Sequence, residues 1–477
     1  MNNKDKDIAF TVLLLACTAV GTSILSVVAS SYFVNALGVG IILWANPICL
    51  PALAVLWINV ADIYALGYLV GAGSAQGGIR AEIFYHLPLL SLGAMCVRVV
   101  VEWSSRDKRA IQSRWILGCY VLWLALLAVT VVASYWGRSL LNPNWTQPTR
   151  IALAMNGMFY GAILWKKIVG RLWILDWLFR ILALSLILYS IGIYWNHIIF
   201  YYVTAAGVLF WYCTSERRLA MALICAIAPV TAFFNVGDTL TLYMLYAMGL
   251  FVGYFTKGKG TFGMSLVSKT WAIFLPILTV IPLVIVMLGY SPKFPTIGFE
   301  GADLLKTRVE DKLYRDRAIL WKEAWESALE SNSVIVAAGK PLNLNISELG
   351  SFVQWEVHAH NVFIEMMYQA GYLALFLFIL LGGVVWYRMR LALMSEISPL
   401  LRAYGTAAFI TIGIGGAVGI FPYDFYAGPW VWLWIGMALS QYDEILCARL
   451  EKTMIDKPLK EIRDAHLQPR RRQRNNA

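Results

Sequence analysis

Long apolar runs, each bounded by polar or charged residues, dominate this chain of 477 residues. A helix needs about 17–25 mostly apolar residues to cross a bilayer. Runs of about this length cover residues 8–30, 82–103, 114–136, 150–165, 172–195, 197–213, 218–236, 238–255, 268–290, 361–386, 400–421 and 428–442. The stretch 31–75 is also apolar but is interrupted by Asn and Pro, and it has room for one or two further spans. The pattern predicts roughly twelve to fourteen membrane-spanning helices.

The composition supports a membrane protein of the all-α class. Apolar residues make up 59% of the chain and charged residues only 14%, whereas soluble domains carry about 25% charged residues. Such a composition excludes a cytosolic enzyme, a secreted disulfide scaffold and a disordered chain. We therefore expect a polytopic helix bundle.

Most of the net charge of +11 follows from the expected topology. When both termini are placed in the cytoplasm, most of the 39 Lys and Arg residues fall in cytoplasmic segments, as the positive-inside rule requires. The tail residues Arg470, Arg471, Arg472 and Arg474 would lie near anionic lipid head groups. We therefore expect membrane lipids as partners and no nucleic-acid partner.

The seven cysteines do not form a recognisable pattern. All except Cys447 lie within apolar runs, and the sequence holds neither a Cys-x-x-Cys motif nor a cluster of Cys and His. A disulfide framework or a zinc site is therefore not expected. We interpret the cysteines as small apolar packing residues.

One long polar segment interrupts the apolar runs and divides the chain. Residues 291–357 hold eight Lys or Arg and ten Asp or Glu, and a loop of this length is uncommon unless it has a function. In the topology above this loop is extracytoplasmic. The predicted parts are an N-terminal and central bundle (1–290), the loop domain (291–357), C-terminal membrane helices (358–445) and a basic cytoplasmic tail (446–477).

The loop contains an amphipathic helix that carries a basic residue on its apolar face. From Leu313 onwards the apolar residues share one face at 100° per residue, and Trp321 lies on that face. Arg317 falls in the centre of the same face, one turn before Trp321, whereas Arg315 falls on the polar side. Burying an unpaired guanidinium is costly. Either Arg317 extends to lipid head groups or water, or an anion from elsewhere binds it.

A second group of polar residues closes the loop and opens the next span. Two of the five histidines, His358 and His360, lie there, directly before Asn361. On the helix that follows, Asn361 and Glu365 are one turn apart. Histidine can accept or donate a proton near neutral pH. The alternative interpretation is a helix start with interfacial side chains, which is common at membrane boundaries.

Together these two segments resemble the bacterial O-antigen ligase and O-antigen polymerase superfamily. The matching pieces are Arg317–Trp321, the later Gly339 and Val357–Asn361. The ligase pattern is His-Asn, nine residues, then Gly, and here His360-Asn361 is followed by nine residues and Gly371. The resemblance covers about 70 residues together with the overall topology.

The resemblance implies an inner-membrane enzyme whose active site faces the periplasm. Members move a glycan from undecaprenyl diphosphate to an acceptor sugar, by a single displacement that inverts the anomeric centre. Arg317 would hold the diphosphate, so neither Mg²⁺ nor another cofactor is needed. His360 would accept the proton of the attacking hydroxyl, and Asn361 or Glu365 could orient its ring. His358 is a further candidate for substrate binding.

The chain departs from the family pattern at two places. The family has a second Arg in an earlier outer turn, whereas the corresponding stretch 234–239 contains none. The candidates for this second cation are Arg308, Arg315, Arg138 and Arg150. In the same stretch Asp238 either contacts sugar hydroxyls or is a turn residue.

The other departure bears on the acceptor. Three residues after Gly371 the pattern expects Gly, Thr or Tyr, and this chain has Ala374. Ligases use the lipid A core as acceptor, and polymerases use another lipid-linked glycan. The nine-residue spacing favours a ligase, whereas Ala374 and the missing Arg argue against one; glycosylation of a pilin is a further variant.

A function from another class is a secondary transporter or flippase. Such proteins have interrupted helices at matching positions of two halves. The chain has Pro47, Pro51 and Pro282 within apolar runs, but its halves do not match. A transporter also has no need for a large loop that carries Arg317, so the sequence favours the glycosyltransferase.

Overall fold

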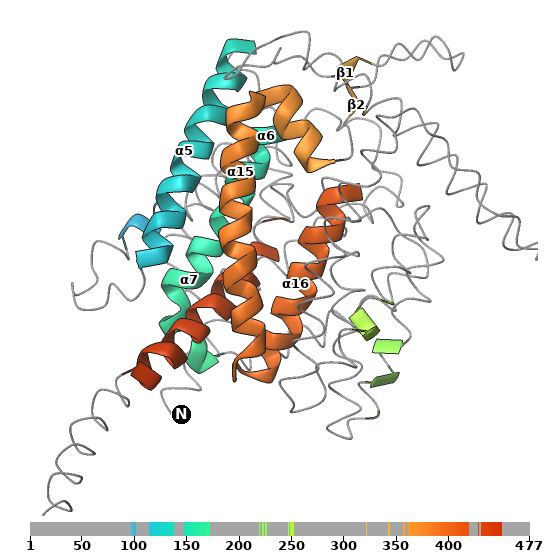
Figure 1. Cartoon of the computed structure of the whole chain (residues 1–477). Coiled ribbons are helices and arrows are strands. Elements are labelled where there is room, and N and C mark those ends of the chain that lie inside the picture. Colours follow the sequence, from blue (N-terminus) through green and yellow to red (C-terminus); the bar gives the residue numbers. More distant parts are fainter. Residues whose placement is uncertain are drawn as a thin grey trace, which may run out of the picture.

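The computed structural model describes four continuous segments, residues 114–137, 147–171, 361–418 and 431–450. It also describes short pieces at 97, 99–101, 219, 222–223, 225–226, 247, 249–251, 321, 342–343, 356–357 and 428. Almost all of these residues are helical, and Figure 1 shows the labelled helices packed side by side as a bundle. This agrees with the predicted all-α class.

The two longest helices in the described part of the chain are antiparallel neighbours. Helix α5 (Arg114–Gly137) and helix α15 (Val362–Met394) pack along each other (Figure 1). Within the described part of the chain, these are the two helices found long and apolar enough to cross a membrane, over Trp115–Ala133 and Val362–Met394. Their outer faces carry bare apolar side chains, such as Val121 (57% exposed) and Phe376 (61% exposed).

The predicted span 150–165 is formed by two consecutive helices. Helix α6 (Gln147–Ala154) and helix α7 (Asn156–Ile168) meet at a turn residue, Met155, and the 3₁₀ helix η2 (Val169–Arg171) follows. The indole nitrogen of Trp123 in α5 donates a 2.6 Å hydrogen bond to the carbonyl of Ala152. This bond satisfies a carbonyl beside the break and ties α6 to α5.

A short reversal joins α15 to helix α16 (Pro399–Val418). Ser398 precedes the first helical residue, and its hydroxyl accepts from the backbone N–H of Leu401 at 3.4 Å. Proline at the first helical position loses no hydrogen bond, so Ser-Pro is a favourable helix start. The side chain of Gln441 accepts from the N–H of Ser398 at 2.7 Å, which attaches the reversal to the last described helix, residues 431–450.

Helix α7 and helix 431–450 approach each other until their backbones touch. A Cβ placed on Gly161 would collide with the carbonyl of Leu433, and one placed on Gly436 would collide with the carbonyl of Met158. The hydroxyl of Ser440 donates to the carbonyl of Ala162 at 2.8 Å. Small residues that permit such close approach are typical of helix contacts in membranes. Met158 lies beside Gly436 and, further along both helices, Ala162 lies beside Ser440, so the two helices are parallel.

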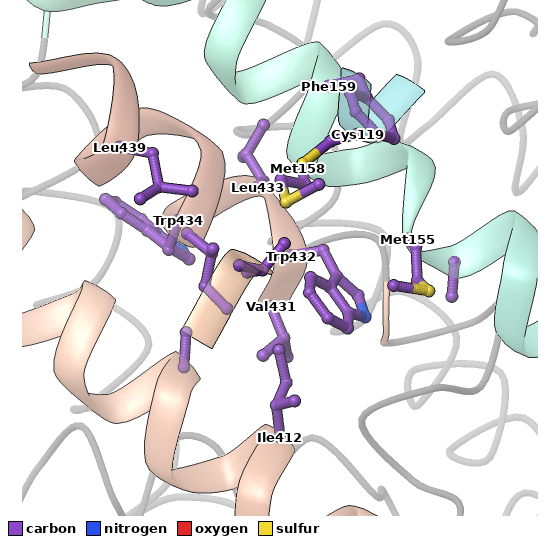
Figure 2. Close-up of a cluster of buried hydrophobic side chains, with 14 of the residues drawn as sticks. Cys119, Met155, Met158, Phe159, Ile412, Val431, Trp432, Leu433, Trp434 and Leu439 are labelled. Atoms are coloured by element: carbon purple, nitrogen blue, oxygen red, sulfur yellow. The ribbon is translucent and has the colours of Figure 1, made fainter. Parts of the chain in front are cut away.

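The buried side chains around this contact form the centre of the core. Figure 2 shows Met158 and Phe159 of α7 gathered with Trp432 and Leu433 of helix 431–450. Cys119 of α5 belongs to the same cluster and is a free thiol. Cys225 is also buried, so burial of these two cysteines agrees with the packing role predicted for them.

At one end of the bundle α7 and α15 end, α5 and α16 begin, and the C-terminal part of helix 431–450 packs against them. The indole nitrogen of Trp115, at the start of α5, donates to Asp443 at 2.5 Å, and Arg388 of α15 lies 3.7 Å from the same carboxylate. Trp165 at the end of α7 donates to Glu444 at 3.1 Å. We call this the basic end, because its described helices carry Arg114, Lys166, Lys167, Arg171, Arg388, Arg390, Arg402 and Arg449.

Two features belong to the predicted loop domain. Strand β1 (Leu342–Asn343) pairs antiparallel with strand β2 (Glu356–Val357), with Leu342 opposite Val357. The sequence did not predict this pair, because strands of two residues show no alternating pattern. Trp321 is helical and only 5% exposed, which agrees with its predicted place on the apolar face of the loop helix.

The glycine contact between α7 and helix 431–450 leads to a prediction about stability. We expect Gly436→Ala to lower the free energy of unfolding by about 1–3 kcal/mol, because the methyl group would force two backbones apart. Gly118→Ala is the matched control, since a Cβ at Gly118 meets nothing within 4 Å. Thermal unfolding of the purified proteins in detergent provides the measurement. Equal melting temperatures for the two variants would contradict the observed contact.

Candidate functional site

The first part of α15 is a separate helical segment. At Gly371 the backbone has φ 88° and ψ 175°, so the helix is interrupted there. Only glycine adopts such angles readily, because a Cβ would clash with the backbone. The interruption leaves a short helix over residues 362–370 and a long one over 372–394, and Figure 1 shows the short helix steeply inclined to the long one.

The short helix begins at a side-chain cap. The Oδ1 atom of Asn361 accepts hydrogen bonds from the backbone N–H groups of Phe363 at 3.0 Å and Ile364 at 3.2 Å. Asn361 itself has extended backbone angles, as a residue that precedes a helix should. Of its two predicted roles, the helix start is the one that this geometry supports.

The short helix contains a buried carboxylate. Glu365 is 0% exposed, and its Oε2 atom accepts a 2.6 Å hydrogen bond from the side-chain amide of Gln369, one turn later. The backbone N–H of Glu365 donates to the carbonyl of Asn361 at 3.0 Å. Burying a carboxylate is costly unless polar partners replace its lost hydration. The amide of Gln369 therefore replaces part of the hydration that the carboxylate of Glu365 loses in the apolar interior.

The surroundings of the short helix differ from those of the long helix. Every residue from Val362 to Gly371 is buried except Phe363, whereas the long helix exposes one face. Helix α6 also packs against α15. The interruption at Gly371 thus turns the short helix into the interior while the long helix remains at the perimeter. A helix held on all sides can position a catalytic group that precedes it.

The structure brings together two of the predicted site residues, Asn361 and Glu365. Arg150, a candidate for the second cation, lies in α6 and is partly buried. Ala374, where the family pattern differs, is fully buried in the core. The remaining candidates lie outside the described residues, namely Arg138, Asp238, Arg308, Arg315, Arg317, His358 and His360.

Sequence reasoning missed two features of this site. Gln369 was not selected, although Glu and Gln four residues apart are neighbours on a helix. Gly371 was noted as part of a pattern, but its role as a helix break was not predicted. A single glycine within an apolar run was the available signal, and it does not distinguish a break from a close helix contact.

Among the side chains that the structure describes, no three His, Cys, Asp or Glu residues lie close enough together to bind a metal ion. The polar groups that converge here are an amide, a carboxylate and a second amide. Such groups can orient an imidazole or bind hydroxyl groups of a sugar.

Comparisons with known proteins add no family assignment. No family model, no curated protein and no solved structure matches this chain significantly.

The interruption at Gly371 leads to a test of the site's architecture. We expect Gly371→Ala to destabilise the protein by about 1–3 kcal/mol, because alanine is strained at this φ and ψ. Gly382→Ala on the long helix is the control, since a Cβ there meets nothing within 4 Å and its backbone is helical. Thermal unfolding in detergent compares the two. A Gly371→Ala protein as stable as the control would mean that α15 is continuous.

The Glu365–Gln369 pair leads to a double-mutant prediction. Gln369→Met removes the donor and leaves the carboxylate less satisfied, so the free energy of unfolding should fall by about 1–3 kcal/mol. With Glu365→Met added, the total loss should be smaller than the sum of the two single losses, because the two side chains contact each other directly. Chemical or thermal unfolding of the single and double variants measures the coupling. Additive losses would argue against the pair.

Proposed function

We propose that the protein is a multi-pass protein of the bacterial inner membrane, with the basic end in the cytoplasm. Two helices of membrane length and their bare apolar faces support this placement. At the basic end α7 and α15 end, α5 and α16 begin, and helix 431–450 arrives parallel to α7, as expected when successive spans alternate in direction. Basic residues prefer the cytoplasmic side of a membrane. Asn361 then lies at the periplasmic end of α15.

We further propose that it is a glycosyltransferase of the O-antigen ligase kind. The observation that carries this proposal is the spacing between His360-Asn361 and Gly371. In the fold those nine intervening residues are one buried helix, capped by Asn361 and ended by Gly371. The spacing in the ligase pattern therefore equals the length of this short helix, which begins after the cap Asn361 and ends at Gly371.

The proposed reaction moves a glycan from undecaprenyl diphosphate to a periplasmic acceptor sugar. An acceptor hydroxyl attacks the anomeric carbon, and the bond from that carbon to the diphosphate oxygen breaks on the opposite side. The electron pair leaves with the diphosphate, whose negative charge Arg317 stabilises without a metal. His360 accepts the hydroxyl proton. Because there is a single displacement, the anomeric centre is inverted.

The local hydrogen bonds favour one of the two residues considered for orienting His360. The Oδ1 atom of Asn361 is engaged by two backbone N–H groups. We propose Glu365 for the orienting role and the helix cap for Asn361, since a carboxylate beside an imidazole holds its tautomer and stabilises the imidazolium. Arg308, Arg315 and His358 complete the proposed substrate-binding group, with Asp238 as a contact to sugar hydroxyls.

The acceptor is either the lipid A core or a second lipid-linked glycan. The nine-residue spacing supports ligation to lipid A core. Polymerisation is supported by Ala374, which stands where the ligase pattern has another residue. Deleting the gene separates the two: long unligated glycan on the lipid carrier indicates a ligase, whereas single repeat units indicate a polymerase.

One observation favours a different class, a secondary transporter or flippase. An interrupted helix with a buried carboxylate beside the break is also found in proteins that carry ions or substrates through membranes. Glu365 and Gly371 form such a combination. This alternative predicts movement of a lipid-linked glycan across vesicles without any new glycosidic bond.

The decisive measurement is glycan transfer by the protein in reconstituted vesicles, with lipid-linked glycan and acceptor supplied on the periplasmic side. We expect His360→Ala to reduce the rate about 10²–10⁴-fold, which is the usual contribution of a general base. His466→Ala, in the tail, should leave the rate unchanged. Full activity of His360→Ala would remove the imidazole from the mechanism, and product-free translocation by the unmodified protein would favour the transporter.

A further inference from the structure

A groove runs along the outer face of the long part of α15 and ends at a guanidinium. It is a shallow, open depression of about 530 Å³ on one face of the helix, lined by Ile379, Leu380, Gly383, Val384, Tyr387 and Arg388. Gly383 forms its floor, since a Cβ there would meet nothing within 4 Å. The side chains that line the groove are largely apolar and exposed: Ile379 is 52% exposed and Tyr387 is 58% exposed. The charged end of the groove is the basic end of the bundle.

The length of the groove corresponds to one leaflet of a bilayer. From Ile379 to Arg388 a helix rises about 14 Å, at 1.5 Å per residue. Half of the hydrocarbon core of a bilayer is about 15 Å thick. A groove of this length places its apolar part beside acyl chains and its guanidinium at the level of the head groups.

Contacts with Trp115 and Asp443 hold the side chain of Arg388 in position without using all of its N–H donors. Its guanidinium lies 5.1 Å from the ring centre of Trp115 and 3.7 Å from the carboxylate of Asp443. The carboxylate is shared, because the indole of Trp115 also donates to it at 2.5 Å. A separation of 3.7 Å exceeds the usual hydrogen-bond length. With its side chain 23% exposed, Arg388 can turn free N–H groups towards a phosphate, which guanidinium binds with matching geometry.

We propose that this groove binds an anionic phospholipid of the cytoplasmic leaflet, with one acyl chain along Gly383 and the phosphate on Arg388. A second copy of this chain would instead require an apolar partner surface, and a guanidinium at the edge of the contact would then lose hydration without gaining an anion. The complementary charge of the head group favours the lipid. The phenol of Tyr387, exposed beside Arg388, is a second donor for the head group.

This inference rests on the membrane placement proposed above but is independent of the transfer reaction. The groove lies at the end of α15 opposite to Asn361, so it is not the proposed site for undecaprenyl diphosphate. Such a lipid would bind at Arg388, the side chain that already contacts Trp115 of α5 and Asp443 of helix 431–450.

The test is native mass spectrometry of the full-length protein, delipidated in detergent and titrated with dioleoyl phosphatidylglycerol or dioleoyl phosphatidylcholine. We expect about a tenfold preference for phosphatidylglycerol, because the choline cation of phosphatidylcholine offsets the phosphate charge that Arg388 attracts. Arg388→Gln should remove the preference, whereas Arg449→Gln, an exposed arginine of the same end paired with Glu396, should retain it.

A second pair of variants tests the proposed binding of an acyl chain along Gly383. Gly383→Leu fills the groove without removing any contact, so it should weaken binding of both lipids several-fold while glycan transfer in vesicles stays unchanged. Gly118→Leu adds the same side chain on the open face of α5 and should bind both lipids as the unmodified protein does. Equal effects of the two leucines, tight binding of free glycerol phosphate, or a change of oligomeric mass with Gly383→Leu would each overturn the proposal.

Discussion

Polar groups inside an apolar interior need partners within the protein, and this constraint shapes the described fold. Asn361 satisfies two backbone N–H groups, and Gln369 satisfies the carboxylate of Glu365. At the other end the indoles of Trp115 and Trp165 donate to Asp443 and Glu444. Where water is excluded an unsatisfied group costs several kcal/mol. The contacts of Asn361 and Gln369 therefore stabilise the short helix itself, whereas the two indole contacts hold helix 431–450 against α5 and α7.

Helix α15 connects the two ends at which these polar groups gather. Its short first segment lies in the interior, and its long second segment presents one face outward. Because Gly371 separates them, the first segment can be held on all sides while the second remains beside lipid. The proposed chemistry and the proposed lipid groove therefore occupy opposite ends of one helix, each organised by a different polar contact.

The agreement between expected and observed helices depends on the length of each apolar run. Helix α5 begins and ends within a residue of the run 114–136. Charged residues at both ends of a long apolar run determine where the membrane-length helix begins and ends. The last helix continues to residue 450, well beyond the run 428–442, because Asp443 and Glu444 find donors on α5 and α7. Partners on other helices are not visible in a local pattern.

The sequence by itself determined the helical class, the positions of long apolar segments and the residue types at the candidate site, because these depend on local composition and spacing. Only the tertiary structure decided that Asn361 is a cap, that Glu365 pairs with Gln369 and that Gly371 interrupts α15. The hydrogen-bond partners are close in sequence, but a helix break and a buried carboxylate are tolerated only when other helices, such as α6, pack around them. That condition depends on residues hundreds of positions apart, which become neighbours only when the chain has folded.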